Sequence, residues 1–445
     1  MFQKKYQKYF KLEYLAFLII FILPWQTRFI YNFDPSNKCE YLNYSLYLTD
    51  ILLIFLIFFH LTTFIKNKNY KIFDIKFLIN KIKTHKAKKY FLLIQKNLFF
   101  NLIIFEILLI LSIIQSENAM ISAYKIWHHI LGLIFFFLLN SLKIDFKKIL
   151  ISFCLGLLLP ACLGIYQFLT QNDFENKWLG LAIHDASQSG ISVIETSDNK
   201  RFLRSYGSLE HPNILGGTLM LGIFFLIYLY KNTKNTLLAS ILIISLIIFY
   251  TALIFSFSRS AYLSIILANL FYLYFLIKNK KIADLKIFFK FKTIFLILFL
   301  INLFCFKEIF LTRFQTNTRL EKLSIQERTS QIENSKNLIK QNFLGGIGIG
   351  NYILKSPEKN PQPVHNIFLL ISTELGFIAL LLFINILKII FQNNLTQKNY
   401  QQIIWIITLI ILFNLDHWFF SLHFGILFFY LLLYILSFKN KAILS

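Results

Sequence analysis

The sequence predicts an all-α membrane protein, a single polytopic domain over residues 1–445 with about twelve transmembrane helices. Hydrophobic residues make up 56% of the chain and charged residues only 15%, and the mean hydropathy is +0.59. The apolar residues fall in blocks of roughly 17 to 22, which is long enough to cross about 30 Å of hydrocarbon. Basic residues cluster between these blocks. The two or three soluble domains that the length alone would suggest are therefore not expected.

Each apolar block defines the core of one predicted span. The cores lie at about 12–30, 45–65, 97–115, 126–142, 149–169, 213–230, 236–257, 260–277, 293–311, 366–387, 401–415 and 419–437. Lys4, Lys5, Lys8 and Lys11 lead directly into the first block without the pattern of a cleavable signal, so the first span is expected to be retained.

The basic segments between the spans predict the orientation. If the N-terminus is cytoplasmic, the cytoplasmic segments are 1–11, 66–96, 143–148, 231–235, 278–292, 388–400 and 438–445, and each is net basic. This agreement with the positive-inside rule predicts that both termini are cytoplasmic. It also accounts for the formal net charge of +24. We therefore expect no nucleic-acid partner, which would require a basic face on a folded soluble domain.

The cysteines give no sign of a metal site or a disulfide framework. Cys39, Cys154, Cys162 and Cys305 show no Cys-x-x-Cys pair and no Cys/His spacing. Neither a metal nor a cofactor is predicted.

Two long segments fall on the external side of the predicted topology, at about 170–212 and 312–365. Loops of this length usually either have a function or are disordered. In the second loop, Ser324 and Glu327 form a capping box that predicts a helix start, and Gly345-Gly346 ends the helix. An apolar stripe at helical spacing predicts that this amphipathic helix lies on the bundle or on the membrane. The stripe comprises Ile325, Ile332, Ile339 and Phe343.

Arg328 falls inside this apolar stripe, whereas Arg319 would point away from it if the helix extended that far back. An arginine on an apolar face is costly unless it is paired, so Arg328 requires carbonyls, a carboxylate or an anionic ligand. The alternative is that it snorkels, or pairs with Glu327 or Glu333.

His365 stands at the entry to the tenth predicted span, behind Pro361 and Pro363, which stiffen the approach. A histidine at a membrane–water boundary can act as a base near neutral pH. Taken alone, a histidine at a loop end is more often structural. Glu374, inside the same span, either orients groups in the bundle or bonds a neighbouring helix.

Arg201 and Arg204 precede Gly207 and the helix entry at His211-Pro212-Asn213. Two arginines, a flexible glycine and a helix start together could bind phosphate, although ordinary loop charge is the alternative.

Three further motifs have structural explanations. Ser258-Arg259-Ser260 and Asp416-His417-Trp418 are interpreted as boundary anchors at short turns. The glycines of 345–350 lack a preceding strand and a Gly-Lys-Ser/Thr sequence, so a backbone turn explains them better than a nucleotide site.

Taken in order, these motifs resemble those of the O-antigen ligase and polymerase family of bacterial membrane glycosyltransferases, and the resemblance covers roughly residues 150–437. The matching pieces are Arg204-Ser-Tyr-Gly207 with His211-Pro-Asn213, Ser256-Phe-Ser-Arg259, Arg319 to Leu323, Glu327-Arg328 with the glycines of 342–350, and His365-Asn366 with Gly376. One departure is Ala379, where ligases usually have Gly, Thr or Tyr.

The resemblance implies metal-independent transfer of a glycan from a polyprenyl-diphosphate carrier to an acceptor at the outer face of the bacterial cytoplasmic membrane. The acceptor is a glycan, a lipid or a protein. Arg204 and Arg328 would hold the diphosphate and His365 would activate the acceptor hydroxyl. Candidate supporting residues are Arg201, Arg259, Arg319, Asn366 and Glu374.

Two alternatives stay open. A ligase and a polymerase share most of these motifs, and the histidine motif favours the ligase. A transporter or flippase for lipid-linked glycans would require paired repeats and polar groups at mid-membrane, and the sequence shows few of these.

Overall fold

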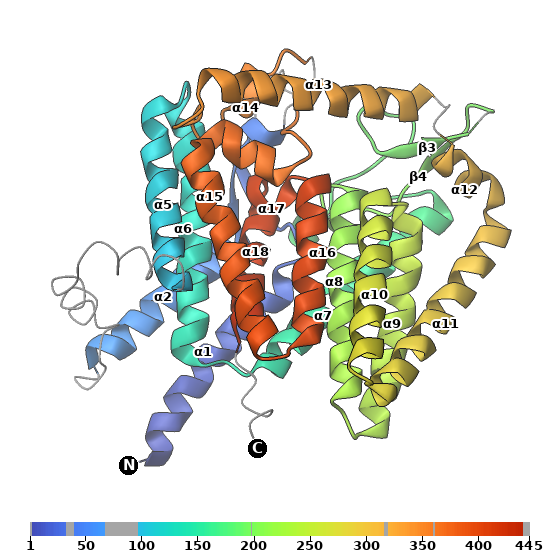
Figure 1. Cartoon of the computed structure of the whole chain (residues 1–445), viewed down its shortest axis with the longest axis horizontal. Helices are drawn as coiled ribbons and strands as arrows, with labels where there is room; N and C mark the ends of the chain where they lie inside the picture. The colour runs from blue at the N-terminus through green and yellow to red at the C-terminus, as the bar shows by residue number, and fades with distance from the viewer. Residues whose placement is uncertain are drawn as a thin grey trace.

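The computed structural model describes residues 2–32, 40–66, 97–196, 198–315, 319–358 and 361–438. The predicted cytoplasmic segment 66–96, except Lys66, lies outside the described residues, as does Cys39. Within the described part of the chain the fold is a bundle of helices with only two short two-stranded sheets, as Figure 1 shows. The prediction of a mostly helical membrane protein is confirmed.

The helices follow the chain in the order α1 to α18, with the labels of Figure 1. They are α1 (Phe2–Ile22), α2 (Leu48–Lys66), α5 (Leu98–Leu111), α6 (Ala119–Leu142), α7 (Phe146–Thr170), α8 (Pro212–Lys231), α9 (Thr236–Ser256), α10 (Arg259–Lys278), α11 (Ile282–Cys305), α12 (Lys307–Phe314), α13 (Arg319–Gln341), α14 (Tyr352–Lys355), α15 (Ile367–Thr396), α16 (Tyr400–Leu415), α17 (Trp418–Ser421) and α18 (His423–Ser437). Three short 3-10 helices lie at Glu40–Leu42, Ser112–Gln115 and Lys177–Leu179.

Eight of the described helices are long and apolar enough to cross a membrane. They start at Leu98, Ala119, Phe146, Pro212, Thr236, Arg259, Ile282 and Ile367. Four shorter apolar helices, at Leu12–Ile22, Leu48–Thr63, Tyr400–Leu415 and His423–Ser437, coincide with the other four predicted spans. An apolar helix thus overlaps every predicted span, while the number of twelve crossings and their orientation stay predictions.

Several boundaries differ from the prediction. The span expected at 12–30 ends as a helix at Ile22, because Pro24 disfavours the helical conformation in the residue before it and donates no backbone hydrogen bond. The chain then forms β1 (Arg28–Asn32), which pairs antiparallel with β2 (Tyr44–Tyr47), so the span expected from residue 45 begins at Leu48. The last predicted span, 419–437, is interrupted at Leu422, where the backbone is extended.

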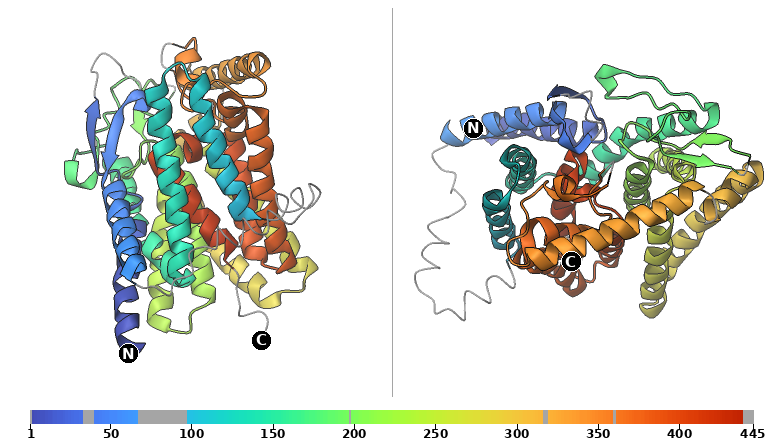
Figure 2. Two further views of the ribbon diagram at one scale, coloured as in Figure 1. Left: turned by 90° about the vertical axis from the view of Figure 1, so that its left-hand side faces the viewer. Right: turned by 90° about the horizontal axis from the view of Figure 1, so that it is seen from above.

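The short strands and the helices α12 to α14 gather at one end of the bundle, which we call the loop-rich end. There α13 lies across the tops of the membrane helices, and Figures 1 and 2 show it running from β3 (Val193–Glu195) and β4 (Arg201–Leu203) towards α15. The first turn of α1 and the last of α18 lie at the opposite end. The predicted external loops are therefore on the same side of the bundle.

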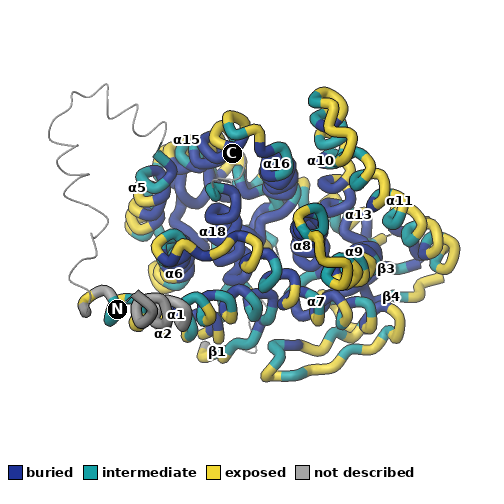
Figure 3. The backbone as a smooth tube through the Cα atoms, turned by 90° about the horizontal axis from the view of Figure 1, so that it is seen from below, coloured by how far each residue is buried: buried dark blue, intermediate teal, exposed yellow. Residues whose placement is uncertain are grey.

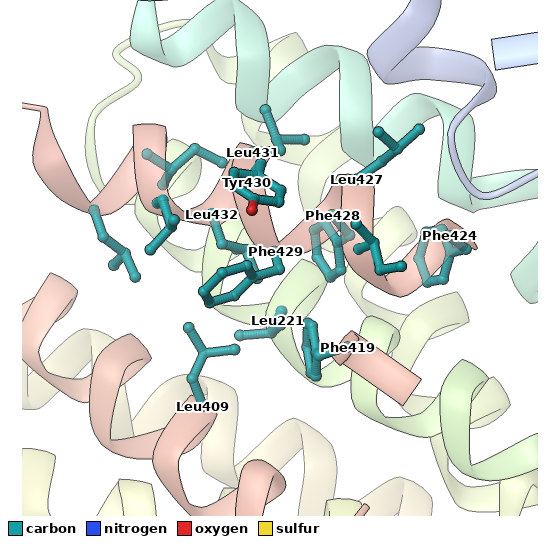
Figure 4. Close-up of a cluster of buried hydrophobic side chains, with 14 of the residues drawn as sticks. Leu221, Leu409, Phe419, Phe424, Leu427, Phe428, Phe429, Tyr430, Leu431 and Leu432 are labelled. Atoms are coloured by element: carbon teal, nitrogen blue, oxygen red, sulfur yellow. The ribbon is translucent and has the colours of Figure 1, made fainter. Parts of the chain in front are cut away.

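The core is centred on α18, which is buried along its whole length. Phe428 and Tyr430 of this helix are completely buried, and they belong to one cluster of buried side chains with Leu409 and Leu221 of neighbouring helices (Figure 4). By contrast, only two residues of α11, Phe291 and Asn302, are buried. Figure 3 shows this contrast between the buried centre and the exposed surface of α10 and α11. A helix that is apolar on all sides and buried by its neighbours is typical of a bundle core.

The glycine segment 345–350 forms the predicted backbone turns, and it packs against a break in α15. Gly376 interrupts the helix with φ +82°, and the amides of Ile347 and Gly348 bond to the carbonyls of Thr373 and Glu374 at 3.0 and 2.9 Å. A Cβ at Gly376 would lie 2.1 Å from the carbonyl oxygen of Leu344. The two backbones meet here without room for a side chain.

We expect Gly376→Ala to destabilise the protein by more than about 2 kcal/mol, because it combines a left-handed φ with a backbone clash. Thermal unfolding in detergent measures this effect. Gly190→Ala is the matched control, since Gly190 has φ +92° but nothing within 4 Å of the position of a Cβ. Equal losses of Tm in the two variants would contradict the clash.

Candidate active site

Arg204, between β4 and α8, is buried and donates three hydrogen bonds to neutral groups. Its Nε donates to the carbonyl oxygen of Ser256 (2.8 Å) and its Nη1 to Oγ of Ser192 (2.6 Å). Its Nη2 donates to Oδ1 of Asn213 (2.9 Å). Burial, and then the nearby Arg313, hold the pKa of Arg204 well below its usual range. With no carboxylate partner among the described residues, this guanidinium favours the approach of an anion.

The loop that carries Arg204 is held in place by Gln167 of α7. Its Oε1 accepts from the amides of Tyr206 (3.0 Å) and Gly207 (2.8 Å), and its Nε2 donates to the carbonyl of Gly207 (3.1 Å). Gly207 has φ +63°, and a Cβ there would lie 2.6 Å from the carbonyl oxygen of Pro160. The glycine predicted to give flexibility instead allows a fixed, close contact between the loop and α7.

Three charged groups form a second part of the site. Glu321 of α13 is buried and pairs with Arg259 at the start of α10 (2.8 Å) and with Arg313 of α12. Arg313 also donates from Nε to the carbonyl of Phe257 (3.1 Å). Burial lowers the pKa of Arg313, while Glu321 acts in the opposite direction. One carboxylate thus joins two arginines, and the group keeps one positive charge in excess.

Arg328 lies on the side of α13 that faces the bundle, but the predicted reason was wrong. The stripe that includes Ile325 and Ile332 is exposed, by 46% and 37% for these two residues. The buried positions are Glu321, Gln331, Ser335 and Leu338, and Arg328 follows Glu321 by seven residues on the same face. The helix also begins at Arg319, before the predicted capping box at Ser324.

Arg328 is partly buried and has no hydrogen-bond or ion-pair partner among the described residues. Neither Glu327 nor Glu333 pairs with it. Arg204, Arg259 and Arg313 each bond to protein groups. Arg328 differs from them, because all of its donors are available to a ligand.

His365 stands beside Asp416 and His417, which lie between α16 and α17. Its Nδ1 is 3.5 Å from Oδ1 of Asp416, and its ring centroid is 4.9 Å from that of His417. Asp416 also accepts from the amide of His417 (2.8 Å), and Nδ1 of His417 lies 2.6 Å from Oγ of Ser421. The side chain of His365 is 19% exposed, whereas Asp416 and His417 are buried. The histidine therefore presents one edge outward while a buried carboxylate faces the other.

His365 acts on the protonation equilibria of both Asp416 and His417. Burial alone would raise the pKa of Asp416, but His365, and then His417 and His211, hold it below its usual range. Burial and then His365 lower the pKa of His417 to about 3. Both effects favour an ionised Asp416 next to a neutral His417 at neutral pH.

His211, the N-cap residue of α8, lies between the arginines and the histidine pair. Burial and then Arg204 hold its pKa well below its usual range, with His365 and Arg328 acting in the same direction and Asp416 in the opposite one. All four groups are therefore close enough to act on one imidazole. The structure brings together Arg204, Arg328 and His365, which come from three distant parts of the sequence.

The part of the site around Arg204 carries an excess of positive charge. Arg204, Arg259 and Arg313 lie there with one carboxylate, that of Glu321, whereas the charge of Glu327 acts on the part around His365. The helices α8, α10 and α15 all begin at this end, so the positive ends of their dipoles point the same way. The site is thus suited to an anionic ligand.

The remaining predicted residues have other surroundings. Arg201 donates to the carbonyls of Ser187 (2.7 Å) and Gln188 (3.1 Å), and Arg319 forms a bidentate pair with Glu195 (3.3 and 2.8 Å) while its side chain is 64% exposed. These contacts brace the β3–β4 loop and tie α13 to it. The helix does extend back to Arg319, and the direction expected for this side chain, away from the apolar stripe, stays a prediction.

Asn366 caps α15 by accepting from the amide of Leu369 (3.0 Å). Glu374 is buried where the glycine segment 345–350 packs against the break in α15, and its Oε1 accepts from the amide of Tyr352 (3.3 Å). The surroundings of Glu374 connect it to the fold of the glycine segment and not to the group around His365.

The sequence interpretation missed Asp416, His417, His211, Arg313 and Glu321. Asp416 and His417 were treated as boundary anchors because they stand in a short turn between two apolar helices. The signal available was the adjacent pair of a carboxylate and an imidazole at the same end of the bundle as His365. His365, Asp416 and His417 also have ligand atoms within 4.8 Å of one another, so they form one of two groups among the described residues that could hold a metal ion.

The free energy of unfolding should fall as the pH drops below about 6.5, since neutral His417 and His211 must accept protons on unfolding. Their folded pKa values lie below the unfolded value, so this stability is complete above pH 6.5 and is lost on acidification. Each histidine lowers the free energy of unfolding by up to about 1.4 kcal/mol for each pH unit of acidification. Unfolding curves from pH 8 to 4 for the wild type and His417→Gln test this, and a variant with an unchanged slope would contradict it.

Comparison with known proteins bears on the region from α9 to α15. No curated protein matches the chain. A family model described as O-antigen ligase matches residues 244–384, a stretch that contains Arg259, Arg313, Glu321, Arg328 and His365 and leaves out Arg204 and Asp416. This match to the O-antigen ligase model supports placing the chain in an O-antigen ligase-like family of multi-pass membrane proteins.

Proposed function

We propose that the protein transfers a glycan from a polyprenyl-diphosphate carrier to an acceptor hydroxyl at the outer face of the bacterial cytoplasmic membrane. The family implies O-antigen ligase-like glycan transfer in cell-surface polysaccharide biosynthesis, and hence a glycosyltransferase-type enzyme. The observation that carries the finer proposal is the position of His365. It lies beside Asp416, and its charge acts on His211 together with those of Arg204 and Arg328.

The donor would bind through its diphosphate. Arg204 and Arg328 would contact the phosphate oxygens, and Arg259 and Arg313, already paired with Glu321, would add to the positive potential. Arginine matches phosphate oxygens with paired donors and stays charged. Because the site lies at one end of the membrane helices, the polyprenyl tail would stay in the bilayer while the glycan projects from it.

His365 would act as the general base. Its ring accepts the proton of the acceptor hydroxyl, and the hydroxyl oxygen forms a bond to the anomeric carbon of the donor sugar. The bond from that carbon to the diphosphate oxygen breaks, and the electron pair leaves with the diphosphate. Asp416 orients the imidazole and stabilises it once it is protonated. This direct displacement inverts the anomeric configuration.

The arginines would stabilise the charge that develops on the leaving diphosphate, as a preorganised electrostatic site does. Their guanidiniums supply the positive charge that a metal would otherwise provide, so we expect transfer to be independent of added divalent metal.

Asp416 is a positioning residue in this scheme. We expect Asp416→Asn to lower kcat by about 10²-fold or more with little change in KM for the lipid-linked donor. Asp416→Glu should recover part of kcat, because it restores the charge. A rise in KM with an unchanged kcat would assign Asp416 to substrate binding instead.

Deletion in the native host, with complementation, tests the function. Loss of a ligase leaves long lipid-linked polymer that never reaches its acceptor, whereas loss of a polymerase leaves single lipid-linked repeats. The histidine motif favours the first result. We expect His365→Ala and Arg328→Ala not to complement. Full complementation by both would contradict the roles proposed for these residues, and an unchanged pool of lipid-linked glycan on deletion would contradict the function itself.

A further inference from the structure

A second cluster of a carboxylate and two histidines lies at the loop-rich end, apart from His365. Asp50 is in the first turn of α2, His128 is in α6 and His423 is the first residue of α18. All three side chains are buried, and their facing ligand atoms lie within 4.8 Å of one another. Three helices that are far apart in the sequence thus direct one ligand atom each to a common point.

One of these atoms has no hydrogen-bond partner in the described part of the chain. Nε2 of His423 is 2.7 Å from Oδ1 of Asp50, a distance that a simple hydrogen bond explains. Nε2 of His128, however, is 3.7 Å from Oδ2 of Asp50, too far for a hydrogen bond, and it is buried without a partner among the described residues. A polar atom that is buried in this way is costly unless a ligand completes the site.

The distances are close to those of a metal site. Two ligand atoms of a tetrahedral ion with bonds of about 2.1 Å lie about 3.4 Å apart. The separation between His128 and Oδ2 of Asp50 is near this value, and the separation between His423 and Oδ1 of Asp50 would have to open by about 0.7 Å.

The ligand set itself carries one negative charge, that of Asp50, when both histidines are neutral. Arg28 is shared between Glu40 and Glu210, at 3.0 and 3.4 Å, so its charge is already paired outside the cluster. Lys125, the basic group that acts on His128, is directed towards the carbonyl of Ser421 (2.8 Å).

The surroundings also fix the orientation of the three ligands. The ring of Tyr47 stacks on His423 with 3.6 Å between centroids and an interplanar angle of 1°. The amide of Tyr47 donates to Oδ2 of Asp50 (3.3 Å), and Tyr124 meets His128 edge to face at 4.5 Å. Such contacts around the ligands are typical of metal sites, where they set the directions of the imidazoles.

We propose that Asp50, His128 and His423 bind one divalent transition-metal ion. Two imidazole nitrogens and one carboxylate oxygen match Zn²⁺ best, with a fourth position left for water. The ion joins α2, α6 and α18. Its role is to hold this part of the bundle together, and it does not depend on the proposed function.

The metal content of the purified full-length protein tests the proposal. The protein is produced in zinc-supplemented medium with a purification tag that contains no histidine. We expect about one Zn²⁺ per chain, and at least about tenfold less in Asp50→Asn and His128→Gln. His417→Gln and His365→Gln are the matched controls, since they remove ligand atoms from the other group that could hold a metal, and both should keep the ion.

A second measurement uses the wild-type protein alone. Removal of the ion by a chelator should lower Tm, and Zn²⁺, but not Mg²⁺, should restore it, since an ion that binds the native state raises the apparent stability. Wild-type protein without zinc and with a Tm unaffected by chelator or Zn²⁺ would overturn the proposal. Zinc that persists in His128→Gln and disappears in His417→Gln would also overturn it, because the ion would then belong to the other group.

Discussion

Replacement of His365 by glutamine should lower kcat by about 10²- to 10⁴-fold, the usual contribution of a general base. Glutamine keeps a polar side chain of similar length but cannot accept the acceptor's proton. Because the histidine is 19% exposed and its contacts with Asp416 (3.5 Å) and the ring of His417 (4.9 Å) are weak ones, its loss should change Tm little. Turnover of lipid-linked donor by purified protein in detergent measures the effect.

His60→Gln is the control for this variant. His60 lies in α2 towards the opposite end of the bundle and bonds Oγ of Ser141 (3.3 Å). We expect it to retain the wild-type kcat. A His365→Gln protein with a kcat within about threefold of the wild type would exclude His365 as the base, since even a weak general base contributes more.

Arg204→Lys should lower kcat/KM for the lipid-linked donor by about 10²-fold or more. A lysine cannot reproduce the three directed hydrogen bonds of the guanidinium, and it presents a single point of charge to the diphosphate. If the loss appears in kcat as well as in KM, the arginine stabilises the leaving diphosphate in the transition state and not only in the bound donor.

Arg204 also connects Ser192, Ser256 and Asn213, so the variant can lose stability. Arg201→Lys separates the two effects, because Arg201 likewise bonds loop carbonyls, those of Ser187 and Gln188, but lies outside the group around His211. We expect Arg201→Lys to keep the donor KM. A donor KM that rises equally in both variants would show that loop structure, and not phosphate contact, explains the change.

The sequence predicted the helical class of the fold because membrane helices are specified by local composition. Blocks of apolar residues must form helices to satisfy their backbone groups in lipid. The boundaries were harder, since they depend on single residues such as Pro24, or on tertiary contacts such as the extended residue Leu422 between α17 and α18.

Only part of the candidate site could be predicted. Motifs indicated Arg204, Arg328 and His365, and in the structure the charges of all three act on one imidazole, that of His211. The buried face of α13 could not be read from its apolar stripe, because a helix at the membrane boundary can expose Ile325 and bury Gln331 instead. Polar residues that line a polar site reverse the usual pattern.

Asp416 shows what a single sequence leaves out. It stands 51 positions after His365, in a turn too short to suggest chemistry, and its role depends on the start of α15 lying beside the end of α16. Likewise, the pairing of Glu321 with both Arg259 and Arg313 is a contact between three helices. Helical periodicity describes each helix by itself, so such groups appear only once the helices are packed.

The central claim is that His365 and the arginines around it carry out glycan transfer from a diphosphate-linked lipid. The most direct measurement is a reconstituted reaction of the purified protein with a polyprenyl-diphosphate-linked glycan and an acceptor, in which released polyprenyl diphosphate and transferred glycan are both quantified. We expect the wild type to release the carrier in step with transfer, and His365→Gln with an unchanged Tm to release almost none. Equal carrier release by the two proteins, or transfer by the wild type without release of polyprenyl diphosphate, would contradict this account.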